Sequence, residues 1–148
     1  ALSSAASDVY KRQVVCLGGR IAESLVFDDV TTGAVQDIRQ ATERARDMVT
    51  KYGFSDELGM INYSTSDDEV FIGREIGHAK NFSEGTAAVI DQEVKRIIEG
   101  CREKATKILK ENRKVLDKLA ELLIEKERIG QQEFEALFEQ NDETIEEM

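Results

Sequence analysis

The residue with the clearest chemical potential is Asp37, which lies in the segment VTTGAVQDIRQATERAR that begins at Val30. The three residues Thr31, Thr32 and Gly33 precede it and are typical of the turn before a helix. At about 100° per residue, Asp37 lies roughly 70° from the centre of an apolar stripe made of Ile38, Ala41, Ala45, Met48 and Val49. We therefore expect a partly buried carboxylate, which needs a polar partner or a metal ion.

Asp37 and a second acidic candidate, Glu23, can each also be explained by structure alone. An acid in the first turn of a helix, such as Asp37, interacts favourably with the helix dipole and needs no function. Glu23 can pair with Arg20, three residues earlier on the same helix, or it can orient a metal ligand within a polar site. The residues alone leave these alternatives open.

Complete catalytic motifs are absent from the sequence. His78 is the single histidine and lies in an expected loop, EIGHAKN, whereas a zinc hydrolase needs the paired histidines of H-E-x-x-H. The stretch GGRIAES lacks the spacing of a phosphate-binding loop, and no spacing singles out a nucleophilic serine. Enzyme and interaction module both remain possible at this point.

Composition limits the class of protein. The 148 residues and 41% hydrophobic content fit one globular domain. The net charge is -10, and residues 131–148 hold seven acids with no Lys or Arg, which argues against nucleic acid and anionic lipid as partners. No run approaches the ~18 apolar residues of a membrane span, so we expect a soluble chain. Cys16 and Cys101 fall on apolar faces and are expected to be buried, reduced thiols.

The first half of the chain predicts two helices. The first is largely buried and covers Val14 to Phe27, where Gly18 and Gly19 suggest a tight helix crossing. The second carries Asp37, is capped by Thr31 or Thr32, and ends at Gly53. Short apolar runs between Gly59 and Ile72 allow a small β-hairpin.

The second half predicts further helices. A long apolar pattern starts after Ser83, a good N-cap, and recurs every seven residues at Val94, Cys101, Ile108, Val115 and Leu122. Asn112 marks a break that gives two antiparallel helices. A short closing helix follows, and a frayed acidic tail is expected over 141–148. The predicted fold class is mainly α, an antiparallel helical bundle.

Four stretches of the sequence stand out as motifs: LGGRIAESLVF, VTTGAVQDIRQATERARDMVTKYGFSDELG, EVFIGREIGHAKNFSEGTAAVIDQEVKRII and LIEKERI. Together they resemble the peptidase domain of the FtsH family, the membrane-anchored AAA+ zinc metalloproteases. The resemblance covers Val14 to Gln140 and leaves 1–13 as an unmatched leader.

The resemblance implies roles for individual residues. Asp37 matches the aspartate of the family's T-G-A-x-N-D motif and would be the third zinc ligand. Glu23 would lie in the second shell of the zinc site, and Thr31, Thr32 and Gly33 would set the ligand-bearing helix. The two His ligands and the general-base Glu would belong to an H-E-x-x-H helix N-terminal to Val14, so the fragment alone is expected to be inactive.

The resemblance also implies the properties of a parent protein. It would be an ATP-driven protease that degrades misassembled membrane proteins and short-lived soluble ones. ATP and magnesium would bind its AAA+ domain, and it would form a homohexamer. Membrane attachment would come through N-terminal segments in the bacterial inner membrane, with the peptidase domain in the cytoplasm.

Two departures from the family pattern accompany this match. Gln36 stands where the family usually has Asn, and Ser24 replaces a frequent second Glu.

Two rival functions are kept: a non-catalytic helical scaffold or oligomerisation module built on the pattern after Ser83, and an acidic adaptor that binds a basic partner through Glu133 to Glu147.

Overall fold

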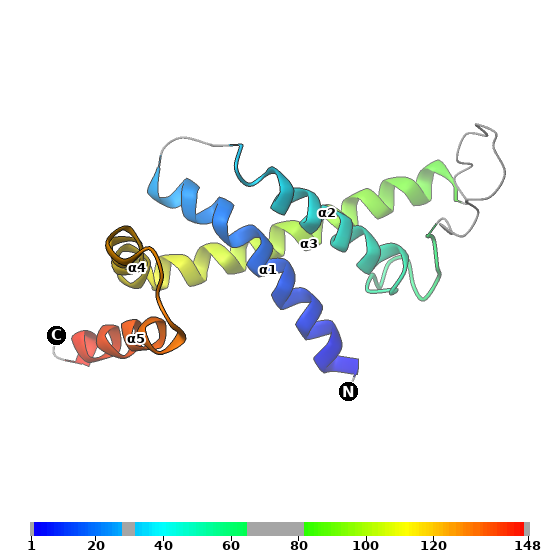
Figure 1. The fold of residues 1–148 in the computed structure, drawn as a ribbon. Helices are drawn as coiled ribbons and strands as arrows, with labels where there is room; N and C mark the ends of the chain where they lie inside the picture. The colour runs from blue at the N-terminus through cyan, green and yellow to red at the C-terminus, as the bar shows by residue number, and fades with distance from the viewer. Residues whose placement is uncertain (1, 28–31, 65–81, 147–148) are drawn as a thin grey trace. The chain divides into compact units, whose positions relative to one another are not determined.

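The computed structural model describes residues 2–27, 32–64 and 82–146, and all regular structure in these ranges is helical. The helices are α1 (Leu2–Val26), α2 (Val35–Thr50), α3 (Glu84–Glu111), α4 (Arg113–Lys126) and α5 (Gln131–Glu146), shown in Figure 1. The chain divides into two compact units, Ala1–Ala105 and Thr106–Met148. The prediction of a mainly α fold is confirmed.

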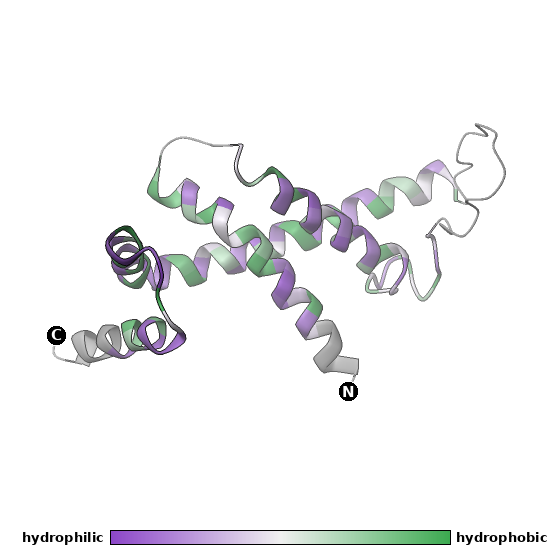
Figure 2. Ribbon diagram, viewed as in Figure 1, coloured by the Kyte–Doolittle hydropathy of each residue, from purple (hydrophilic) through white to green (hydrophobic). Residues whose placement is uncertain are grey.

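The core of the first unit forms where α1 and α2 pack together (Figure 1). α2 runs back along α1, so that Arg44 contacts Cys16 and Tyr52 lies in the same pocket as Val9. Apolar side chains from three helices fill the core: Val14, Leu17, Ile21, Ala41, Ala45, Met48, Val49, Ile90, Val94, Ile97 and Cys101. Figure 2 shows hydrophilic and hydrophobic residues alternating along α2 and α3, as expected for amphipathic helices.

Helix α1 corrects two expectations. It begins at Leu2 rather than Val14 and continues without a break through the segment that was set apart as a leader. A Cβ placed on Gly18 or Gly19 would meet nothing within 4 Å, so within the described residues the predicted tight crossing is wrong there. The close approach lies elsewhere, because a Cβ on Gly100 would stand 3.4 Å from the Tyr10 hydroxyl.

The two ends of α2 differ in how well they were predicted. Ala34 is the N-cap, and among the described residues no side chain caps the helix. Capping by Thr32 is therefore wrong, whereas Thr31 lies outside the described residues. A backbone bond from the Val35 N–H to the Thr32 carbonyl closes the turn. At the other end the helix stops at Thr50, and Gly53 adopts a φ of 64°. The helix thus ends three residues before the expected Gly53. Gly53 supplies the turn that follows, because glycine enters this region without steric penalty.

Helix α3 starts where predicted. The Ser83 hydroxyl accepts a hydrogen bond from the Thr86 N–H at 3.2 Å, which satisfies one of the free donors of the first turn. Upstream, residues 59–64 carry no strand, and the rest of the expected Gly59–Ile72 hairpin lies outside the described residues. His78 lies outside them as well.

In the second unit α4 packs against α5. The break at Asn112 is confirmed, whereas the antiparallel arrangement of the helices on its two sides stays a prediction. Helix α5 continues to Glu146 rather than ending before the acidic tail. Glu133 supports its start, because its carboxylate accepts bonds from the Gly130 N–H at 3.4 Å and from the Lys126 ammonium at 2.5 Å.

Candidate metal-ligand site

Asp37 lies in the first turn of α2 and is exposed. The expectation of partial burial is therefore wrong. The buried stripe of α2 starts only at Ala41, and Ile38, beside Asp37, is itself 42% exposed. The described residues cover the middle and end of α2 and leave its first turn open, so the Asp37 carboxylate is accessible.

The turn before Asp37 is held by the backbone. Thr32 and Gly33 are exposed, and Thr31 lies outside the described residues. Ala34 is buried at 6% exposure, and its carbonyl accepts the Ile38 N–H at 3.0 Å. Among the described residues, the buried Ala34 methyl and these backbone bonds, rather than the Thr32 side chain, fix where α2 begins and hence where Asp37 projects.

Glu23 pairs with Arg20 on α1. The Arg20 side chain is 24% exposed and the Glu23 side chain is 30% exposed. Their nearest charged atoms, Nη1 of Arg20 and Oε2 of Glu23, lie 3.7 Å apart. This is the structural interpretation foreseen for Glu23. A half-buried ion pair is also able to orient a neighbouring ligand, so the arrangement is compatible with both roles.

No cluster of three or more His, Cys, Asp or Glu side chains that could hold a metal ion occurs among the described residues. Zinc sites that catalyse hydrolysis use three protein ligands and leave a fourth position for water. An exposed carboxylate at the start of a packed helix suits one ligand of such a set. The described part of the chain supplies this one candidate and needs further ligands from outside it.

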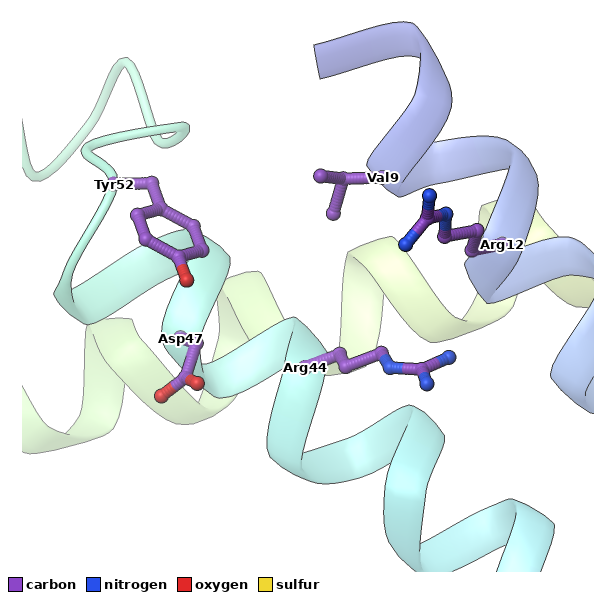
Figure 3. Close-up of a pocket in the computed structure, with 5 residues that line it drawn as sticks. All are labelled: Val9, Arg12, Arg44, Asp47 and Tyr52. Carbon is purple, nitrogen blue, oxygen red and sulfur yellow. The ribbon is translucent and has the colours of Figure 1, made fainter. Parts of the chain in front are cut away.

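A pocket of about 180 Å³ lies between α1 and the end of α2, lined by Val9, Arg12, Arg44, Asp47 and Tyr52 (Figure 3). Asp47 is ten residues after Asp37, about 15 Å along the helix axis, so this pocket is separate from the candidate ligand. Its charges are already engaged in part: Arg44 donates to the Cys16 sulfur at 2.8 Å, and Asp47 pairs with Lys51 at 3.0 Å.

The sequence reasoning missed a buried polar group, Glu93 on α3, which is 7% exposed and paired with Arg96. The sequence pattern could have indicated this buried pair. Glu93 lies on the apolar stripe of the helix, three residues after Ile90 and four before Ile97, and Arg96 follows about one turn later. Charges on such a stripe are seldom buried unless they are paired.

The family is established by comparison with known proteins. The family model of Peptidase family M41 matches residues 2–137. The chain therefore belongs to this family of peptidases, in agreement with the helical fold. The match includes most of the 1–13 segment, which the sequence resemblance alone had left outside.

Curated relatives are similar over most of the chain. An ATP-dependent zinc metalloprotease FtsH of Caldicellulosiruptor bescii is 52% identical over 131 residues, which is 88% of this chain and 21% of the relative. FtsH 1 of Thermoanaerobacter is 49% identical over 136 residues, 92% of this chain and 22% of the relative. FtsH of Thermotoga maritima is 43% identical over 139 residues, which is 94% of this chain and 23% of the relative. The chain thus spans about a fifth of the length of these relatives.

Proposed function

We propose that this chain is the C-terminal part of an ATP-dependent zinc metalloendopeptidase and that Asp37 is its carboxylate zinc ligand. The observation that carries the proposal is the exposed Asp37 carboxylate in the first turn of α2, within a chain that belongs to a peptidase family. The relatives' names state a zinc metalloprotease, which supports zinc as the metal.

The proposed ligand set is divided between segments. Two histidines and a general-base glutamate come from an H-E-x-x-H helix that precedes Val14 in the parent, and Asp37 adds the third ligand. When bound, zinc lowers the pKa of a coordinated water and polarises the peptide carbonyl. Asp37 contributes a negative charge on a helix whose position the α1–α2 packing fixes. Glu23 orients a ligand from the adjacent helix.

The test begins with the gene. The coding sequence upstream of Ala1 is expected to encode, in frame, an H-E-x-x-H motif after an AAA+ module. In the protein that it encodes, Asp37→Asn should lower proteolysis at least roughly a hundredfold, because a weaker ligand replaces one of three. Zinc content should fall with it, while ATP hydrolysis stays near the unchanged level.

The matched control is Glu43→Gln, another exposed acid on the same helix, which pairs with Arg39. This variant should keep both zinc and proteolysis. Full proteolysis by the Asp37→Asn protein would show that Asp37 is no ligand. It is the result that the helical-scaffold alternative predicts, because a scaffold does not need this carboxylate.

Further properties of the parent belong to the same proposal. ATP and magnesium act in an AAA+ domain outside this chain, the substrates are polypeptides, and six copies assemble into a ring. None of the helices in the described residues is long and apolar enough to cross a membrane, so attachment to the bacterial inner membrane would use other segments of the parent. This fragment by itself is expected to lack proteolytic activity.

A further inference from the structure

Two arginines of the first unit have no acidic partner among the described residues. Arg12 makes no hydrogen bond or ion pair with them. Arg44 donates to a thiol and an amide, the Cys16 sulfur at 2.8 Å and the Gln40 Oε1 at 3.5 Å; sulfur is a weak acceptor. The other described arginines of this unit are each paired with a carboxylate: Arg20, Arg39, Arg46, Arg96 and Arg102. Two guanidinium groups therefore keep unused donors.

These two arginines line the same pocket, the one between α1 and the end of α2. Figure 3 shows the Arg12 side chain projecting from α1 toward α2 and the Arg44 side chain projecting from α2 toward α1. Arg44 is half-buried and held by its contact with Cys16, whereas Arg12 is exposed. One guanidinium thus forms a fixed part of the wall, and the other can adjust to a ligand.

The pocket lining selects the class of ligand. Arg12, Arg44 and Asp47 leave one net positive charge on the wall, which suits a monoanion. The planar guanidinium donates two parallel hydrogen bonds to a carboxylate. Val9 and Tyr52 add aliphatic and aromatic surface. The volume of about 180 Å³ admits a ring, because a cavity of about 150 Å³ holds benzene.

We propose that this pocket binds a carboxylate carried by a ring-sized apolar group, with Arg12 and Arg44 donating to the carboxylate oxygens and Val9 and Tyr52 contacting the apolar group. A free aromatic acid and the C-terminal residue of a peptide both carry this chemistry. The site is separate from the proposed zinc ligand, because Arg44 follows Asp37 by two helical turns, about 10 Å along the axis of α2.

The experiment is an NMR titration of the ¹⁵N-labelled 148-residue chain with benzoate at constant ionic strength. Benzoate should shift the Arg12 and Arg44 Nε–H signals and the Tyr52 amide signal, and the shifts should saturate. Benzamide has the same ring without the charge and should bind at least roughly tenfold more weakly. Equal binding of benzamide would overturn the proposal, because the arginines would then contribute nothing.

Substitutions locate the site. Arg12→Gln and Arg44→Gln should each weaken benzoate binding at least roughly tenfold. Arg12 has no partner among the described residues, so its replacement should leave the helical circular dichroism spectrum unchanged. Arg39→Gln, the same change at an exposed α2 arginine paired with Glu43, is the control and should keep the affinity. Unchanged affinity in Arg12→Gln, or an equal loss in Arg39→Gln, would overturn the proposal.

Two further titrations separate this site from the zinc proposal and identify the source of the carboxylate. Asp37→Asn should bind benzoate with unchanged affinity, whatever its effect on zinc. Glycyl-glycyl-phenylalanine is compared with its C-terminal amide. Tighter binding of the free-acid peptide than of benzoate would assign the pocket to a peptide C-terminus, and tighter binding of benzoate would assign it to a free aromatic acid. Binding of neither would overturn the proposal.

Discussion

At the scale of single residues, Glu127 is under conformational strain. It ends α4 with a φ of 61°, a left-handed conformation in which its N–H still bonds to the Leu123 carbonyl at 3.0 Å. Side chains with a Cβ reach this region at a cost of roughly 1 kcal/mol relative to glycine. Helices commonly place glycine at such an end.

We expect Glu127→Gly to stabilise the second unit by about 0.5–1 kcal/mol, because the helix end no longer strains a Cβ. Urea unfolding monitored by circular dichroism measures the change. Glu121→Gly is the counterpart: Glu121 is an exposed glutamate in the interior of α4, and the change should destabilise by about 1 kcal/mol. A destabilised Glu127→Gly protein would contradict the assignment of strain.

The two cysteines should differ in reactivity. Cys101 is fully buried, and burial raises the pKa of its thiol, so little thiolate forms near neutral pH. Cys16 is partly exposed, and Arg44 donates to its sulfur. With a maleimide, Cys16 should react in the native protein and Cys101 only after urea is added. Peptide mass spectrometry identifies the order, and modification of Cys101 first would contradict it. Both are free thiols, as predicted, although the predicted burial holds for Cys101 alone.

At the scale of elements, the caps of α2 and α3 make a matched pair. Ser83→Ala removes a side-chain cap that the structure contains and should cost about 1 kcal/mol of stability. Thr32→Ala removes a hydroxyl at a helix start with no side-chain cap and should change stability by less than about 0.5 kcal/mol. Thermal unfolding of the two variants measures the difference. A larger loss for Thr32→Ala would show that the threonine supports α2 after all.

At the scale of the whole molecule, the two units differ in how much apolar surface they bury. The first has a three-helix core, whereas the buried apolar residues of the described second unit are Val115 and Leu137. Leu123, Ile124, Phe134 and Phe138 remain 37% exposed or more. Small units with few buried side chains have little stability of their own.

The backbone amide hydrogens of α4 and α5 should therefore exchange with solvent faster than those of α2 and of the part of α3 that ends at Ala105. Val115→Ala, which removes a central contact of the second unit, should accelerate exchange there and leave the Ala45 and Val49 amides protected. Hydrogen exchange with mass spectrometry resolves the two units. Equal exchange throughout would indicate that they unfold as one.

The sequence by itself determined the family, the helical class, the start of α3 at Ser83, the glycine turn at Gly53 and the break at Asn112. These follow from local signals: apolar spacing, a capping hydroxyl and a glycine that enters positive φ. The stripe Ala41, Ala45, Met48 and Val49 was read correctly for the same reason, since it sets the buried face of α2.

Only the tertiary structure decided which parts of each helix are covered. Ile38 belongs to the apolar stripe and Asp37 lies at its edge, yet packing in the described residues covers the stripe only from Ala41 onward. The buried hydrogen bond from the Gln13 side chain to the Ala41 carbonyl joins residues 28 positions apart in the sequence. Periodicity shows which face of a helix is apolar, but contacts between distant segments decide how far along the helix that face is buried and which polar groups it encloses.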